Sequence, residues 1–274
     1  MINKSSQVGN WINLAGYDVF VLEETGSTND DAKNYSGQIA DEFVVWAKHQ
    51  TAGRGREDRY WQATEGCSLT FSVLLRPIEK EKEFLSRFTT LGALALTDLL
   101  SSAYALDAEI KWPNDVLIRE KKVSGILTEI TWRGSSIESI ILGIGINLKD
   151  RAFTNAGKLR FPATSLEAEG INIESMQTLL EKLLAALQLR RQQLGSAQFL
   201  DDWNQKLAFK DKFMPIKQYQ GKTEMLCPGS INPDGSLNAR DQAGNWRVVH
   251  SAEFSASSII SSSTSSSSTE DCSS

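Results

Sequence analysis

The sequence contains little histidine, cysteine or proline: two, three and six residues respectively among 274. Two histidines argue against a histidine-based metal site. The three cysteines, Cys67, Cys227 and Cys272, lie far apart along the chain. This spacing indicates neither a zinc knuckle nor a disulfide framework, and it is typical of a protein from a reducing compartment.

Long apolar runs and an excess of positive charge are also absent. No run approaches the roughly 20 apolar residues that cross a membrane, and residues 1–16 lack the apolar stretch of a signal peptide. The formal net charge is −5, so the chain as a whole does not attract nucleic acid. We therefore expect a cytoplasmic protein, or one in the stroma or matrix after loss of a leader, with no membrane and no DNA partner. Any anion site in it is expected to be local.

The order of strand-like and helix-like segments predicts an α+β fold. We expect strands at 17–24, 43–50 and 67–77, a hairpin formed by 124–134 and 136–148, and helices at 84–103, 175–194 and 197–207. Closely spaced turn signals after this region predict a small β-barrel. In residues 255–274 twelve of the twenty residues are serine, which is typical of a disordered tail. The expected division is a catalytic domain at 1–208, the barrel at 209–254 and the tail at 255–274.

The segment QTAGRGREDRYW, at 50–61, combines glycines with arginines directly after an expected strand. Glycines let backbone N–H groups approach phosphate oxygens, and Arg54, Arg56 and Arg59 can add bidentate contacts to an anion. Trp61 offers a flat face on which a purine can stack. A solvated basic loop with a buried tryptophan is the alternative interpretation. The segment is not a P-loop, because no Lys-Ser or Lys-Thr pair follows the glycines.

Lysines and a carboxylate gather in KWPND, at 111–115, and in the segment that follows it. Pro113 predicts a fixed turn, which presents Asp115 just before a short strand. Lys121 and Lys122 precede a strand that we expect to begin near Gly125. A charged strand edge that discourages aggregation explains these two lysines equally well.

Two further motifs point to a small polar ligand. Gly143 and Gly145 in GIGINL mark a place where a ligand or another chain approaches a strand closely. Ser27 and Thr28 follow the first expected strand, and either hydroxyl could cap a helix that begins near Asp30. The same hydroxyl groups can also bind a polar ligand.

The ordered set STN, QTAGRGR followed by Trp61, KWPND with KKVSGIL, and GIGINL resembles the biotin protein ligases, from about Tyr17 to Phe254. The resemblance implies a class II synthetase-like core, with a central mixed β-sheet backed by helices, and a small C-terminal β-barrel of the Src-homology type. It implies that biotin and ATP form biotinoyl-5'-AMP. The biotinoyl group then passes to a lysine of a biotin carboxyl carrier protein, of acetyl-CoA carboxylase or another biotin-dependent carboxylase.

The resemblance also implies a role for each matching residue. Lys122, Arg54 and Arg56 would be catalytic, because two anions must meet and no protein nucleophile is needed. The expected contacts to biotin are Ser27, Thr28, Asn29, Gln50, Arg54, Gly55, Arg56 and Lys122. The expected contacts to ATP and the adenylate are Trp61, Asn114, Asp115 and Asn147. Asp115 is also the candidate ligand for the Mg²⁺ that accompanies ATP.

The sequence departs from the family pattern in two places. Glu57 and Asp58 stand where many members continue with a further Arg-Gly pair, and they weaken the local positive field. Residues 1–16 are too few for the DNA-binding domain that precedes the core in bifunctional members. We therefore expect a monofunctional ligase without repressor activity, as a monomer or a homodimer.

Three other interpretations stay open at this point. Lipoate ligases share the fold and the adenylation chemistry, although their loops do not read GRGR or KWPND. A nonenzymatic nucleotide- or nucleic-acid-binding module would explain arginine and tryptophan in one loop, but it predicts further basic clusters. An inactive ligase core with a regulatory role would retain the motifs without the reaction.

Overall fold

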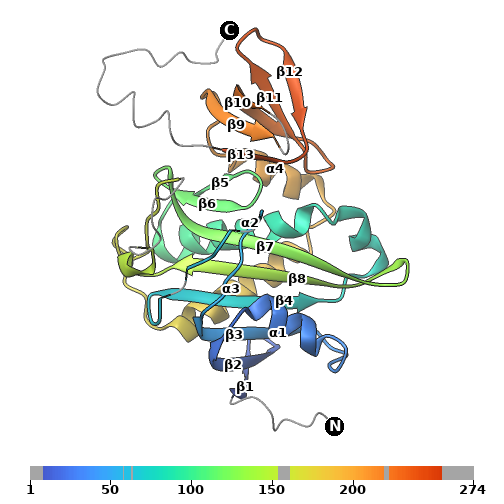
Figure 1. Cartoon of the computed structure of the whole chain (residues 1–274), viewed down its shortest axis with the longest axis vertical. Coiled ribbons are helices and arrows are strands. Elements are labelled where there is room, and N and C mark those ends of the chain that lie inside the picture. The colour runs from blue at the N-terminus through green and yellow to red at the C-terminus, as the bar shows by residue number, and fades with distance from the viewer. Residues whose placement is uncertain (1–8, 58, 63, 154–160, 219–221, 255–274) are drawn as a thin grey trace.

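The computed structural model describes residues 9–57, 59–62, 64–153, 161–218 and 222–254. Its larger part is an eight-stranded mixed sheet in the order β1-β2-β3-β4-β8-β7-β6-β5 (Figure 1). The strands are β1 (Gly9–Leu14), β2 (Tyr17–Thr25), β3 (Phe43–Gln50), β4 (Ser68–Leu75), β5 (Glu109–Lys111), β6 (Asp115–Ile118), β7 (Lys121–Arg133) and β8 (Ser136–Asn147). β2 pairs with β3 in parallel, and the other neighbours pair antiparallel.

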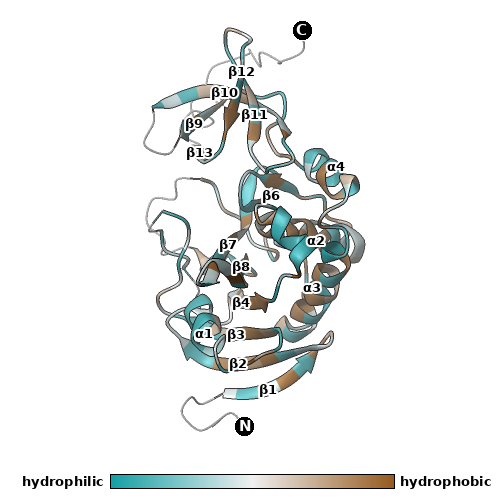
Figure 2. Cartoon of the chain, turned by 90° about the vertical axis from the view of Figure 1, so that its right-hand side faces the viewer, coloured by the Kyte–Doolittle hydropathy of each residue, from teal (hydrophilic) through white to brown (hydrophobic). Residues whose placement is uncertain are grey.

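Helices cover both faces of this sheet (Figure 2). One face carries α2 (Arg87–Tyr104) and α3 (Met176–Arg191), with α4 (Ala197–Gln205) beside them, and the opposite face carries α1 (Thr28–Tyr35). In β2, Val19 and Val21 belong to the core on the α2 side, whereas Phe20 and Leu22 belong to the smaller core under α1. Successive side chains of a strand alternate between the two faces of its sheet. A run of apolar residues such as that in β2 is therefore buried on both faces.

A second sheet of five antiparallel strands lies at the end of the molecule next to β5 and β6 (Figure 1). Its order is β12-β11-β10-β9-β13, with β9 (Met214–Gln218), β10 (Thr223–Ile231), β11 (Leu237–Asp241), β12 (Trp246–Val249) and β13 (Ala252–Phe254). Its tight turns use Gly235 and Gly244, whose φ values are +86° and +87°. The sheet is consistent with the expected small barrel. The serine-rich tail lies outside the described residues.

The predicted hairpin and the three predicted long helices are confirmed, with small shifts at their ends. The hairpin is β7 and β8, which pair from Ser124 and Ile146 to Arg133 and Ser136. The first of these helices begins at Arg87, because the residues before it form a short 3₁₀ helix, η1 (Glu79–Phe84). A second 3₁₀ helix, η2 (Asp150–Ala152), follows β8.

Three boundary predictions were wrong. The sheet begins with β1, which the sequence did not predict and which pairs with β2 across a turn at Ala15 and Gly16. β7 begins at Lys121 rather than near Gly125, because a turn at 119–120 returns the chain directly from β6. α1 begins at Thr28 rather than Asp30, and Ser27 occupies the N-cap position without a side-chain capping bond.

No helix within the described ranges is long and apolar enough to span a lipid bilayer.

Candidate functional site

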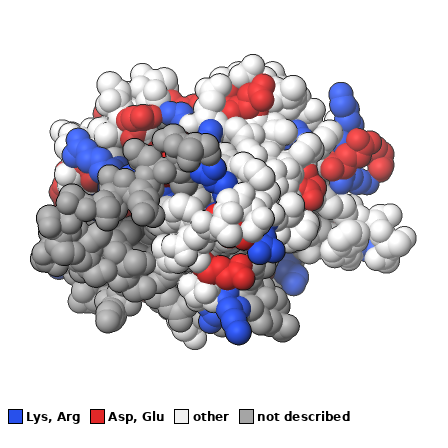
Figure 3. All heavy atoms as spheres, turned by 90° about the horizontal axis from the view of Figure 1, so that it is seen from above, with Lys and Arg blue, Asp and Glu red and all other residues white. Residues whose placement is uncertain are grey.

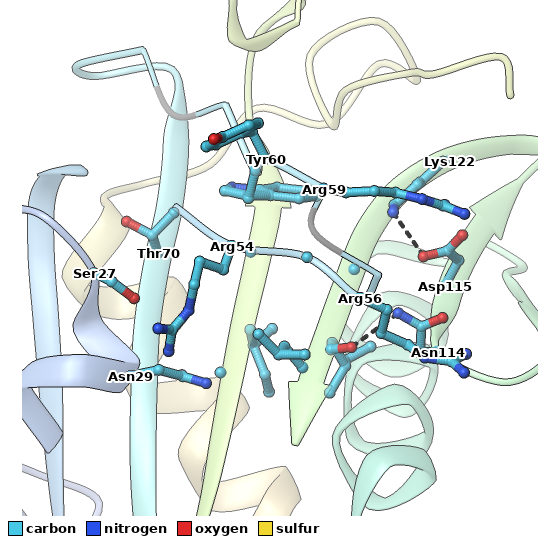
Figure 4. Close-up of a pocket in the computed structure, with 18 of the residues that line it drawn as sticks. Ser27, Asn29, Arg54, Arg56, Arg59, Tyr60, Thr70, Asn114, Asp115 and Lys122 are labelled. Carbon is cyan, nitrogen blue, oxygen red and sulfur yellow. Dashed lines mark hydrogen bonds and ion pairs between the residues drawn. The ribbon is translucent and has the colours of Figure 1, made fainter. Parts of the chain in front are cut away.

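A cavity enclosing about 860 Å³, including its open mouth, lies where the loops after β2, β3 and β5 meet the strands β7 and β8. It gathers nearly all the predicted site residues, several of which are drawn in Figure 4: Ser27, Thr28, Asn29, Gln50, Arg54, Gly55, Arg56, Trp61, Asn114, Asp115 and Lys122. These residues span 96 positions of sequence, and the mixed sheet brings them to one place.

Buried polar groups line one end of the cavity. Gln50 Oε1 accepts hydrogen bonds from the backbone N–H and the hydroxyl of Thr28, at 2.9 and 3.1 Å. Ser72 Oγ lies 2.7 Å from Thr28 Oγ1 and 2.6 Å from Asn29 Oδ1. Each of these residues is less than a tenth exposed. These hydrogen bonds hold the side chains of Thr28, Asn29 and Gln50, which line the cavity, in fixed orientations toward a ligand.

The arginine loop folds back on itself as a small hairpin over the cavity. Gly55 N–H donates to Arg59 O at 2.7 Å, and Trp61 N–H donates to Gly53 O at 2.8 Å. A Cβ at Gly53 would lie 2.3 Å from Gln50 Nε2, so this close approach requires glycine.

The three arginines of the loop point to different parts of the site (Figure 4). Arg54 turns toward Asn29 and pairs with Asp30 at 2.8 Å and with Glu129 at 3.0 Å. Arg56 donates to Ser251 Oγ, next to β13, at 3.1 Å. Arg59 extends toward Lys122 and Asp115. The loop thus contacts α1, β7 and the C-terminal sheet at once.

A buried carboxylate between two ammonium groups forms the opposite end of the cavity. Asp115 lies 2.6 Å from Lys111 Nζ and 2.6 Å from Lys122 Nζ. Burial alone would raise the pKa of Asp115, but the two lysines hold this pKa well below its usual range. Burial lowers the pKa of Lys111, Asp115 opposes this, and the charges of Lys122 and Arg59 add to the lowering. More positive than negative charge is gathered here, which suits a site for anions.

Trp61 packs against two glycines of neighbouring strands. A Cβ at Gly145 would lie 2.3 Å from Trp61 Cε2, and one at Gly125 would lie 3.2 Å from Trp61 Cζ3. Lys122 Nζ lies 5.5 Å from the centroid of the indole ring. At Gly143 a Cβ would lie 2.2 Å from Asn29 Oδ1. Gly143 and Gly145 therefore do mark close approaches, and the approaching groups are Asn29 and Trp61 of this chain.

Of the two asparagines predicted to contact ATP and the adenylate, one lines the cavity and the other does not. Asn114 lines the cavity, and its Nδ2 donates to Ile126 O at 3.0 Å. Asn147 is not among the residues that line the cavity. Its Nδ2 donates to Thr164 O at 3.0 Å and so holds the segment after residue 160 beside β8.

The predicted role of Asp115 as a Mg²⁺ ligand does not fit this arrangement. Both of its carboxylate oxygens contact ammonium groups. Across the described ranges, no three His, Cys, Asp or Glu side chains cluster in a way that could hold a metal ion. We therefore assign no metal-binding residue.

Several residues that the structure brings to the site had no role predicted from the sequence, and Lys111, Glu129 and Ser251 are three of them. Lys111 is the second partner of Asp115, and the two are opposite residues in the β5–β6 hairpin, which the turn at Pro113 could have indicated. Glu129 and Ser251 pair with the arginine loop across 75 and 195 positions of sequence. No local pattern marks such distant partners.

Fold and cavity together define a ligand-binding α+β protein whose site holds fixed polar groups at one end and gathered cations at the other. Residues 21–147 match the sequence model of the biotin/lipoate A/B protein ligase family. The biotin–[acetyl-CoA-carboxylase] ligase of Paracoccus denitrificans is 30% identical over 85% of this chain and 98% of its own length. The chain belongs to the biotin/lipoate A/B protein ligase family.

Two further comparisons support this membership. The bifunctional ligase/repressor BirA of Bacillus spizizenii is 36% identical over 62% of this chain and 53% of its own length, so the chain spans about half of that relative. The solved biotin protein ligase of Aquifex aeolicus in complex with biotin and ATP superimposes with a TM-score of 0.71 at 27% identity, covering 86% of this chain and 97% of that one.

Proposed function

We propose that this protein is an ATP-dependent biotin ligase. In the first half-reaction a carboxylate oxygen of biotin attacks the α-phosphorus of ATP. The bond from that phosphorus to the pyrophosphate breaks, and biotinoyl-5'-AMP forms. In the second, the ε-amine of a lysine on a biotin carboxyl carrier protein attacks the acyl carbon, so that an amide forms and AMP leaves.

The observation that carries the proposal is the pairing of two unlike ends within one cavity. Buried hydroxyl and amide groups of Thr28, Asn29 and Gln50 form one end. They fit the cyclic urea of biotin, which both donates and accepts hydrogen bonds. The dithiolane ring of lipoate has no N–H donor and no carbonyl acceptor with which to bind these groups. The end with the hydroxyl and amide groups thus favours biotin over lipoate.

The charged end suits the reaction of two anions. Lys122 is partly exposed and lines the cavity, and among the described residues its ammonium group pairs with one carboxylate, that of Asp115. Arg56 lines the same cavity, and Arg59 extends toward Lys122. We propose that Lys122 and Arg56 neutralise the carboxylate and the phosphoryl group, and that Trp61 stacks on adenine. Arg54 lines the cavity too, but two carboxylates already contact its guanidinium group.

The proposal includes a protein partner and a location. The partner is a biotin carboxyl carrier protein of acetyl-CoA carboxylase or another biotin-dependent carboxylase, as the name of the Paracoccus relative suggests. The proposed location is the cytoplasm, where ATP is supplied. Mg²⁺ would screen the phosphates of ATP, and we assign it no side-chain ligand among the residues that the structure describes. The oligomeric state stays a prediction of monomer or homodimer.

A nucleic-acid-binding role is the weaker alternative. On the face seen over the C-terminal sheet, the basic and acidic side chains of the described residues are interspersed rather than gathered by sign (Figure 3). The described part of this face shows no continuous basic surface, and the net charge of −5 agrees with that.

Pyrophosphate release tests the proposed function. The protein is incubated with ATP and Mg²⁺ together with biotin, lipoate or no acid. We expect pyrophosphate release only in the sample that contains biotin. The amount should be limited to about one equivalent per protein molecule while the adenylate stays bound. Equal release with lipoate would instead assign the chain to the lipoate branch of the family. No release with either acid would favour an inactive core.

A further inference from the structure

Three segments that are distant in sequence meet at the carboxylate of Glu129, in the middle of β7. Its Oε2 accepts from Asn29 Nδ2 at 2.6 Å, and both of its oxygens accept from a terminal nitrogen of Arg54, at 3.0 and 3.2 Å. The same Arg54 nitrogen lies 2.8 Å from Asp30 Oδ1. Strand β7, the start of α1 and the arginine loop are therefore joined at one point.

Asn29 is fixed at both ends of its amide. Its Oδ1 lies 2.6 Å from Ser72 Oγ, and its Nδ2 donates to Glu129. A carboxylate only accepts hydrogen bonds, so Glu129 determines which end of the amide is Nδ2. Asn29 also lies directly against Gly143, so the amide has little room to turn.

The charge around Arg54 differs from that at the other end of the cavity. Two carboxylates, those of Asp30 and Glu129, face one guanidinium group. At the other end, two ammonium groups share the single carboxylate of Asp115. Incoming anions are attracted to the second arrangement and not to the first.

We infer that Glu129 is a positioning residue. With Asp30, it anchors the arginine loop over the cavity through Arg54, and it orients the amide of Asn29. Arg54 then serves chiefly as the attachment point of the loop, and Arg56 and Lys122 meet the reacting anions. This inference rests on the proposed function for the identity of the ligand, but the anchoring itself is a property of the empty protein.

The test compares Glu129→Gln with Glu138→Gln in the full-length protein. Glutamine keeps an oxygen that can accept from Asn29 but loses the charge that holds Arg54. Glu138 lies near the turn of the same β7–β8 hairpin, where it pairs with Arg133, and it does not line the cavity. Thermal unfolding of both variants checks that the fold is intact.

The first readout is cleavage of the empty protein by trypsin, which cuts after arginine. We expect cleavage within the loop to be about three- to five-fold faster in Glu129→Gln, the change in an opening equilibrium that follows loss of a partly exposed ion pair. Glu138→Gln should be cleaved like the unmodified protein. Equal cleavage of all three proteins would overturn the anchoring role.

The second readout separates positioning from chemistry. A loop that is closed less often should raise the KM for biotin by the same three- to five-fold, and kcat should change by less than about two-fold because bound ligand selects the closed loop. In an Arg54→Gln background, Glu129→Gln should add little, since the partner is already absent. A fall in kcat at unchanged KM, or full additivity with Arg54→Gln, would contradict the inference.

The two proposals fail in different ways. If the unmodified protein does not release pyrophosphate with biotin, the proposed function is wrong, and the trypsin comparison still decides whether Glu129 anchors the loop. If pyrophosphate is released and the trypsin comparison shows no difference, the function stands and the anchor does not.

Discussion

Replacing Asp115 with asparagine should destabilise the protein far more than breaking a surface ion pair with a similar N–O distance. Asp115 and Lys111 have side chains only 6% and 8% exposed, and Lys111 Nζ lies 2.6 Å from the carboxylate. Asparagine leaves a buried ammonium group without its counter-ion, which costs about 3–5 kcal/mol of the free energy of unfolding. The matched control is Asp107→Asn, whose carboxylate pairs with Lys206 at 2.7 Å but is 88% exposed. This control should lose at most about 1 kcal/mol.

Urea unfolding of both variants at a series of pH values measures the loss in free energy of unfolding and shows how that loss changes with pH. The pKa of Asp115 is held well below its usual value, so its contribution is complete above about pH 4 and is lost as the pH falls through the folded-state pKa. Burial lowers the pKa of Lys111. As the pH rises, this lysine therefore loses its proton before the pH reaches the usual lysine pKa of about 10.4.

A neutral lysine needs no counter-ion. The penalty in Asp115→Asn should therefore be largest near pH 7 and should shrink as the pH rises toward 10. A penalty no larger than that of Asp107→Asn, or one that stays constant over this range, would refute the reasoning.

Three further predictions concern the reaction. Lys122→Gln should slow adenylation by on the order of 10²-fold, which is the scale for losing one preorganised charge contact. Its thermal stability should change little, because Lys111 still pairs with Asp115. Lys121→Gln is the control, and a larger loss of adenylation in that variant would mean that the wrong lysine was assigned. Arg56→Ala should let biotinoyl-adenylate escape, which a blot for biotin on a bystander protein detects, and a clean blot with normal adenylate formation would argue against a covering loop. Gly145→Ala would place a Cβ 2.3 Å from Trp61 and should raise the KM for ATP, whereas alanine at Gly37, where nothing lies within 4 Å of the added Cβ, should leave it unchanged.

The sequence was sufficient to predict which segments form the site. Each motif follows or opens a strand of strong hydrophobic pattern, and such strands were predicted within a few residues of their observed bounds. Glycine inside a strand indicated close approach at Gly143 and Gly145, and the structure confirms the close approach, although the approaching side chains belong to this chain rather than to a ligand or another chain. These are local features, which a single sequence records directly.

The partners of the charged side chains could not be predicted in the same way. Asp115 next to a phosphate site suggested a metal ligand, but the β5–β6 hairpin places Lys111 directly opposite it. Arg54 suggested an anion-binding group, but the fold brings Glu129 to it from β7. Which charges meet depends on strand order and register, and one sequence without its tertiary contacts does not specify these.

Mass spectrometry of a biotin carboxyl carrier domain tests the central claim most directly. The domain is incubated with this protein, ATP and Mg²⁺, with biotin or lipoate as the acid. We predict that one biotinoyl group is added to one lysine of the carrier, only when ATP and biotin are both present. An unmodified carrier, or equal modification by lipoate, would contradict the assignment of this chain as a biotin ligase.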